Sequence, residues 1–216
     1  MSIGVYKYIK RIVDIIFSII FIVLTFIPML IIAFLIWKDD GGSPFFIQDR
    51  MGKDLIPFKM IKFRSMKENR KELDGKMTHE QMVTKFGAFL RKTSLDELPQ
   101  LFNVFIGKMS FIGPRPWMLQ YYDSMTPIQK RRANVKPGIT GLAQVRGRNG
   151  IPIQKKIEYD LEYVNHFGWK YDVKILIETI KVVLSKDNAE ITESGITQEL
   201  RDLKENPKGK KRKVRS

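Results

Sequence analysis

An uncharged apolar segment, from Ile15 to Trp37, constrains the fold of this 216-residue chain more than any other feature. As a straight helix it would extend about 34 Å, at about 1.5 Å per residue, which is enough to cross the hydrocarbon core of a bilayer. The segment is too long for a signal peptide, and no small-residue cleavage site follows it. It therefore predicts a membrane-bound protein.

Two features leave open whether the segment crosses the membrane. Pro28 lies near its middle, where a proline removes a helical hydrogen bond and kinks the helix. Basic residues flank it on both sides, although positive charge normally marks only the cytoplasmic flank. A kinked, re-entrant helix with both ends in the cytoplasm explains both features, whereas composition alone favours a spanning helix that tolerates its proline. The basic residues are Lys7, Lys10 and Arg11 before the segment and Lys38, Arg50, Lys53, Lys59, Lys62 and Arg64 after it.

The rest of the chain predicts a small α+β domain that is mostly helical. Residues 45–48 and 57–63 are expected to form a β-hairpin with a turn around residues 51–53. Helices are expected at 81–91 and after Leu98, because apolar residues recur there at helical spacing. A further amphipathic helix, "YDVKILIETIKVVL", carries one apolar face and could either lie on the membrane surface or pack on the core. That face consists of Val173, Leu176, Ile177, Ile180, Val183 and Leu184.

The formal charge of +15 points to an anionic partner, which could be nucleic acid, phospholipid or a phosphorylated small molecule. Part of this charge lies in the tail "PKGKKRKVRS", where a solvated basic segment beside an anionic membrane needs fewer assumptions than a nuclear-import signal. The absence of cysteine excludes thiolate chemistry, and two histidines are too few for a multi-histidine metal site. We predict three parts: a re-entrant membrane anchor (1–40), a catalytic domain (41–186) and a polar, basic tail (187–216).

An adjacent acidic pair, Asp96 and Glu97, stands where an apolar helix is expected to begin. One interpretation is structural: Ser94 and Glu97 match a capping box, and acidic residues stabilise the first helical turn. The other is chemical, since arginines with no use in capping accompany the pair at Arg91, in "GPRP" and in "RGRNG". Arginine binds phosphate oxygens with its planar fork, and we expect cations to keep a nearby carboxylate ionised. An ionised carboxylate can attack phosphorus once the phosphate charge is neutralised, which favours phosphoryl transfer.

Four motifs, in order and spacing, resemble the bacterial sugar transferase family, the monotopic polyprenyl-phosphate glycosyl-1-phosphate transferases. They are "KFRSM" (62–66), "SLDELPQLFNV" (94–104), "GKMSFIGPRP" (107–116) and "VKPGITGLAQVRGRN" (135–149), and the resemblance covers about residues 5–185. It implies transfer of a sugar-1-phosphate from a UDP-sugar to undecaprenyl phosphate, with release of UMP and a covalent aspartyl-phosphosugar intermediate. Such a reaction is the first membrane step of bacterial glycoconjugate synthesis (capsule, O-antigen or glycoprotein).

The resemblance also implies roles for particular residues. Asp96 would be the nucleophile and a ligand of the required Mg²⁺, and Glu97 would assist it. The substrate phosphates would be bound by Lys62, Arg91, Arg115 and Arg148, and Pro28 would break a re-entrant helix. The protein would then lie on the cytoplasmic face of the bacterial inner membrane. Its partners would be the UDP-sugar, undecaprenyl phosphate and membrane lipids, without nucleic acid; the sequence leaves the oligomeric state open, a homodimer included.

Departures from the family pattern, and one rival class of function, complete these expectations. Ile27 stands where small members often have serine, and Thr25 could instead supply a hydroxyl to a carbonyl that Pro28 frees. Lys108 replaces the family's usual aspartate, and "GRN" (147–149) is a pointer to N-acetylated sugars. The rival is a non-catalytic basic membrane adaptor. A glycoside hydrolase is excluded, because carboxylates on neighbouring residues cannot readily flank a glycosidic bond.

Overall fold

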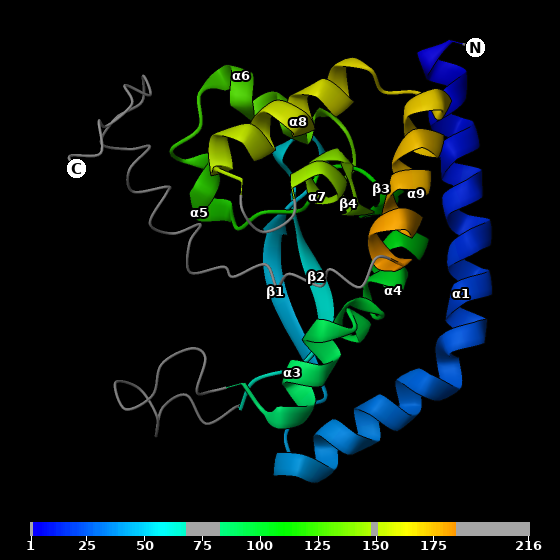
Figure 1. Ribbon diagram of the computed structural model, residues 1–216, viewed down its shortest axis with the longest axis vertical. Helices are drawn as coiled ribbons and strands as arrows, with labels where there is room; N and C mark the ends of the chain where they lie inside the picture. Colours follow the sequence, from blue (N-terminus) through cyan, green and yellow to red (C-terminus); the bar gives the residue numbers. More distant parts are fainter. Residues whose placement is uncertain (1, 68–82, 148–150, 185–216) are drawn as a thin grey trace.

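The computed structural model describes residues 2–67, 83–147 and 151–184. Its longest element is helix α1 (Ile3–Asp40), which runs along one side of the molecule and bends partway along its length (Figure 1). The helix begins where the Ser2 side chain accepts a hydrogen bond from the backbone N–H of Val5. It ends at Gly41, which adopts the left-handed conformation that favours glycine. The predicted membrane segment is therefore part of one continuous helix of 38 residues.

Pro28 lies inside α1. Because proline has no backbone N–H, the carbonyl of Leu24 loses its helical donor. The expectation that Thr25 would supply a hydroxyl to such a carbonyl is wrong, since its Oγ1 donates to the carbonyl of Phe21 at 2.6 Å. The physical reason is reach: a threonine hydroxyl in a helix contacts the carbonyl one turn before it, not that of its direct neighbour.

The predicted hairpin is present as strands β1 (Phe45–Met51) and β2 (Pro57–Phe63), which pair in antiparallel register from Phe45 with Phe63 to Met51 with Pro57. The first strand is three residues longer than expected and includes Met51, so the turn lies later in the chain. A short 3₁₀ helix, η1 (Lys53–Leu55), forms this turn with two non-glycine residues in the left-handed region, Asp54 at φ 55° and Leu55 at φ 61°. Because every residue of β2 pairs with a residue of β1, the ladder extends past residue 48, where β1 was expected to end.

After β2 the described chain forms helix α3 (Lys85–Lys92), 3₁₀ helix η2 (Leu95–Glu97) and helix α4 (Gln100–Phe105). The first predicted helix begins at Lys85 rather than at 81, because Thr84 caps it by accepting a hydrogen bond from the N–H of Gly87 at 2.8 Å. Residues 81 and 82 lie outside the described part of the chain.

A second small sheet escaped prediction from sequence. Strand β3 (Ser110–Ile112) pairs in parallel with β4 (Gly138–Thr140), and each strand has only three residues. The loop "GPRP" follows β3 directly. The remaining elements are helices α5 (Leu119–Tyr122), α6 (Pro127–Lys130), η3 (Arg131–Asn134), α7 (Leu142–Gly147), α8 (Ile153–Asn165) and α9 (Trp169–Leu184). The predicted class, α+β and mostly helical, is confirmed.

Helix α1 contacts the globular part of the chain along both of its halves. In its first half Asp14 accepts hydrogen bonds from the hydroxyl of Ser110 and the N–H of Phe111. Lys10 and Tyr6 both donate to Asp172 of α9. In its second half an apolar cluster joins α1 to β2 and α3, with its buried members being Met29, Ile32, Ile36, Phe63 and Leu90. Helix α1 and the rest of the described chain therefore form one packed unit.

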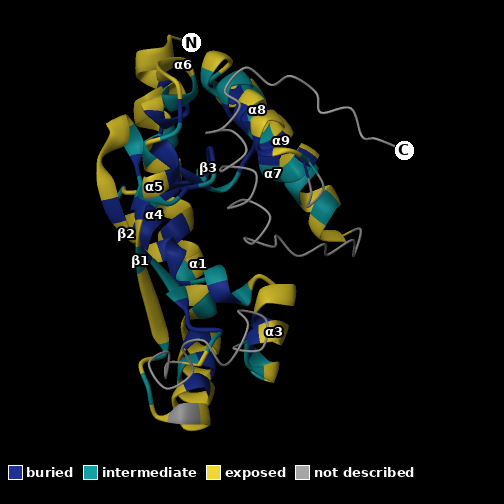
Figure 2. Ribbon diagram, turned by 90° about the vertical axis from the view of Figure 1, so that its left-hand side faces the viewer, coloured by how far each residue is buried: buried dark blue, intermediate teal, exposed yellow. Residues whose placement is uncertain are grey.

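Much of the remaining surface of α1 is apolar and exposed (Figure 2). Val23, Leu24 and Ile27 are 62–69% exposed, and α1 is the one described helix long and apolar enough to cross a membrane. The apolar face predicted on α9 is exposed as well, by 47–75%, so that face does not pack on the core; Ile175, on another side, does. Apolar surface of this extent is typical of a protein that contacts lipid or another protein.

Candidate active site

The acidic pair lies in a sharp turn between α3 and α4. Helix α3 ends at Lys92, and Ser94 takes the left-handed conformation at φ 56°, from which the short helix η2 begins. A non-glycine residue in this conformation is strained, and the conformation persists only where the surrounding structure holds it. The capping-box interpretation is wrong, because the Ser94 side chain makes no capping hydrogen bond and the Glu97 carboxylate bonds to other elements.

Glu97 is held by two cations that come from distant parts of the chain. Its Oε1 accepts a hydrogen bond from Lys62 Nζ of β2 at 2.8 Å and from Arg115 Nη2 of the loop after β3 at 2.9 Å. Burial by itself would raise the pKa of Glu97, but Arg115 and Lys62 outweigh it and lower the pKa to about 2. Glu97 is therefore a permanently ionised bridge between the two cations.

Asp96 has a different environment, although it is the adjacent residue. It is 8% exposed, and its Oδ2 lies 3.7 Å from Lys62 Nζ, which is an ion pair rather than a hydrogen bond. Within the described residues no group donates a hydrogen bond to its carboxylate. Burial, assisted by the charge of Glu97, raises the pKa of Asp96 against the opposing effect of neighbouring cations. Our expectation that cations keep Asp96 ionised stays a prediction: Lys62, Arg115 and Arg91 lower its pKa, but burial opposes them, and Glu97 accepts the hydrogen bonds of Lys62 and Arg115.

Of the other two predicted phosphate-binding residues, Arg91 lies at the site, whereas Arg148 cannot be placed. Arg91 of α3 donates from Nε to the Ser65 hydroxyl at 2.8 Å, and its charge acts on the pKa of Asp96. Arg148 lies outside the described residues. The structure thus brings Lys62, Arg91, Asp96, Glu97 and Arg115 together from four segments, while Pro28 belongs to α1.

Residues 5–186 match the bacterial sugar transferase family. The chain belongs to this family. It is 39% identical over 183 residues to "Uncharacterized sugar transferase EpsL" of Bacillus subtilis, covering 85% of this chain and 91% of that protein. It is 39% identical over 187 residues to "UDP-glucose:undecaprenyl-phosphate glucose-1-phosphate transferase" of Escherichia coli, and 39% over 201 residues to "Galactosyl transferase CpsE" of Streptococcus agalactiae. These alignments cover 82% and 85% of this chain but only 40% and 44% of those relatives.

A buried asparagine that we did not predict holds this sugar transferase's site together. Asn103 of α4 is 1% exposed; its Nδ2 donates to the carbonyl of Lys59 at 2.8 Å, and its Oδ1 accepts from the N–H of Ile61 at 3.0 Å. It thereby fixes β2, which carries Lys62, against the helix that follows the acidic pair. The sequence could not reveal this role, because both partners are backbone groups more than forty residues away.

Replacing Asn103 by alanine is expected to lower the free energy of unfolding by about 1–3 kcal/mol, since the side chain of a buried residue and its two partly buried backbone hydrogen bonds are lost. Denaturant unfolding of the protein in detergent measures this change. Asn134→Ala, at an exposed asparagine of η3, is the control and should change stability little. An Asn103→Ala protein as stable as the wild type would contradict the assigned role.

The site's residues can accommodate a magnesium ion in one way. No group of three or more potential ligands exists among the described side chains. Magnesium in phosphate-handling sites, however, is commonly held by one or two carboxylates together with substrate phosphates. Asp96 fits this requirement, because its carboxylate is not occupied by hydrogen bonds, unlike that of Glu97. Lys108 follows α4 and so lies at the opposite end of that helix from the acidic pair.

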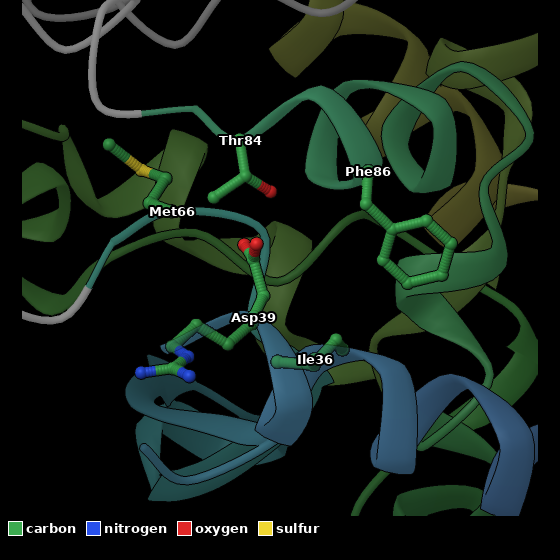
Figure 3. A pocket seen from close by; sticks show the side chains of 6 residues that line it. Ile36, Asp39, Met66, Thr84 and Phe86 are labelled. Carbon is green, nitrogen blue, oxygen red and sulfur yellow. The ribbon is translucent and has the colours of Figure 1, made fainter. Parts of the chain in front are cut away.

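The two best-defined hollows of the described surface are small, and the acidic pair lines neither of them. Figure 3 shows the first, at the C-terminal end of α1, where Ile36, Asp39, Met66, Thr84 and Phe86 line it together with Arg64. The second is lined in part by Gly52, Pro114, Arg115 and Pro137. Of these two hollows, the second includes a site residue, Arg115.

Proposed function

We propose that this chain transfers a sugar-1-phosphate from a UDP-sugar to undecaprenyl phosphate and releases UMP. The observation that carries the proposal is the contrast between two adjacent carboxylates. Glu97 is tied to Lys62 and Arg115, whereas the Asp96 carboxylate has no hydrogen-bond donor in the described structure. Relatives named as undecaprenyl-phosphate sugar-1-phosphate transferases support the same reaction.

The proposed reaction has two displacements at one phosphorus atom. An Asp96 carboxylate oxygen attacks the phosphorus that bears the sugar, and the bond from this phosphorus to the bridging oxygen breaks, so that UMP leaves. A phosphate oxygen of undecaprenyl phosphate then attacks the same phosphorus and displaces the aspartate. The product is the sugar linked to the lipid through a diphosphate, and the carboxylate is regenerated.

The neighbouring side chains divide the work of binding and orientation. Lys62 and Arg115 would neutralise the diphosphate, and Arg91 would add a third cation; the charges of all three act on Asp96. Glu97, with its pKa of about 2, cannot serve as a proton donor near neutral pH. Its assisting role is therefore to orient the two cations. A magnesium ion held by Asp96 and the phosphates would supply further neutralisation of the phosphate charge.

The contacts of α1 support a re-entrant topology over a spanning one. Both halves of the helix pack on the same globular domain, through Asp14 in the first and Met29 and Ile32 in the second. A helix that crossed the bilayer would hold its two ends on opposite sides, where one small domain could not contact both. We therefore propose a monotopic protein at the cytoplasmic face of the inner membrane, with the exposed apolar face of α9 at the lipid interface.

The decisive experiment is a UMP-release assay with undecaprenyl phosphate and a panel of donors. UDP-glucose and UDP-galactose are included because of the relatives' names, and UDP-N-acetylglucosamine because of the "GRN" sequence. With the lipid withheld, labelled sugar phosphate should remain on the protein. Release of no UMP with any donor, with salt-sensitive binding to anionic vesicles, would favour the adaptor function instead.

Removing divalent cations with EDTA is expected to stop UMP release, and added Mg²⁺ to restore it, because the phosphate charge would otherwise be incompletely neutralised. The melting temperature is the internal control and should stay constant, since the described fold contains no cluster of metal ligands. Undiminished turnover in EDTA would remove the magnesium requirement from the proposal.

A further inference from the structure

Arg132, in η3, is a buried arginine whose guanidinium uses all three of its nitrogens in hydrogen bonds. Only 1% of it is exposed. Its Nε and Nη2 donate to Oδ2 of Asp160 at 2.9 and 2.6 Å, and its Nη1 donates to the Tyr122 hydroxyl at 2.6 Å. The guanidinium carbon lies 3.9 Å from the centre of the Trp117 ring. One further bond runs from Nη2 to the main-chain carbonyl of Arg115 at 2.8 Å.

The bond to Arg115 is not needed to neutralise the buried charge, because Asp160 already pairs with Arg132. A buried ion pair is moreover weak evidence for stability, since apolar residues of similar volume often stabilise a protein as well. Arg132 also holds three segments of the chain in a fixed relative orientation, because its hydrogen bonds have a fixed geometry. Its planar fork joins α8 through Asp160 and α5 through Tyr122 to a single carbonyl of the loop that carries Arg115.

This loop is held by its backbone at several consecutive positions. The N–H of Gly113 donates to Thr140, the carbonyl of Pro114 accepts from Gly138, and the carbonyl of Trp117 accepts from Met51, each at 2.9 Å. Between them stands Arg115, whose carbonyl is held by Arg132 and whose side chain reaches Glu97. Fixing the backbone at Arg115 narrows the directions that its side chain can take.

We propose that Arg132 is a positioning residue for the transfer reaction and acts through Arg115. It fixes the main chain of the "GPRP" loop so that the Arg115 guanidinium stays on Glu97 and faces the substrate diphosphate. The inference rests on the proposed function. Lysine cannot replace arginine here, because one ammonium group cannot meet the carboxylate, the hydroxyl and the carbonyl with the same geometry.

A double-mutant cycle on kcat/KM for UMP release tests this dependence. Arg115→Ala should lower kcat/KM about 10²-fold, as expected for losing one preorganised donor, and Arg132→Lys about tenfold. Because Arg132 acts through Arg115, the double variant should be no slower than Arg115→Ala alone. The matched control is Arg131→Lys, the adjacent arginine of η3, which bonds only to Asn165 in the described structure and should change nothing. Independent, multiplying losses in the double variant would overturn the proposal.

Two additions keep the test decisive. If Arg132→Lys does not fold, Tyr122→Phe takes its place; it removes one anchor of the guanidinium, and its smaller loss of kcat/KM should again vanish in the Arg115→Ala background. If the wild-type protein releases no UMP, the proposed function fails, but the positioning can still be measured. NMR of the labelled arginine guanidinium groups should then show that the contact between Arg115 and Glu97 is weakened in Arg132→Lys. An unchanged contact between Arg115 and Glu97 would refute the positioning role.

Discussion

Asp96→Asn is expected to reduce UMP release by about 10⁴-fold or more, since the amide cannot form the acyl-phosphate bond and loss of a nucleophile has effects of this size. Labelled sugar phosphate should also no longer remain on the protein when lipid is withheld. Glu97→Gln is the matched comparison at the neighbouring position. It keeps the shape but weakens the hold on Lys62 and Arg115, so a smaller loss is expected.

Asp96→Asn should leave the fold intact or stabilise it. Burial raises the pKa of Asp96 in the folded protein above its value in the unfolded chain. The folded state therefore binds the proton more tightly. The free energy of unfolding falls as the pH rises from the pKa of Asp96 in the unfolded chain to its higher pKa in the folded protein. An uncharged asparagine removes that penalty, so the melting temperature near neutral pH should not drop. Wild-type turnover in Asp96→Asn would end the proposal that Asp96 is the nucleophile; a large drop in melting temperature would contradict the burial argument.

Deletion of residues 1–38 is expected to abolish transfer to undecaprenyl phosphate, and to destabilise the domain as well. The deletion removes Met29, Ile32 and Ile36 from their cluster, which exposes Phe63 and Leu90. Each large apolar side chain lost from a core costs about 2–5 kcal/mol, and stability is commonly about 5–15 kcal/mol in total. Circular dichroism and the UMP-release assay together measure both effects. Full activity of a folded, truncated protein on the long-chain acceptor would contradict the expectation.

A variant that changes only the lipid-facing surface separates anchoring from folding. Replacing Val23, Leu24 and Ile27 by serine leaves the packed face of α1 unchanged, because these three residues are exposed. The domain should keep its melting temperature while its partition into membranes weakens. Equal membrane binding by this variant and the wild type would show that the exposed face of α1 does not carry the anchoring.

Much of the fold was accessible from local patterns. The apolar run and Pro28 predicted a kinked membrane helix, and a single bent α1 contains both. Two short strand-like segments on either side of a glycine-containing turn predicted the β1–β2 hairpin. The β3–β4 sheet could not be predicted in this way, because two three-residue strands far apart in the chain pair only when loops from elsewhere bring them together. Helix α9 shows the same limit: its periodicity predicted an apolar face, but only the packing showed that this face is exposed.

The sequence by itself indicated a membrane helix and predicted Lys62, Arg91, Asp96, Glu97 and Arg115 as site residues, because hydropathy and motif spacing are local properties. Only the tertiary structure decided how two adjacent carboxylates differ. Lys62 and Arg115 lie 35 and 18 residues from Glu97 in the sequence, and both donate hydrogen bonds to its carboxylate. The Asp96 carboxylate receives neither bond and so could react. A hydrogen bond forms over a few ångströms in space, and no spacing along the chain specifies which of two neighbouring oxygens will receive it.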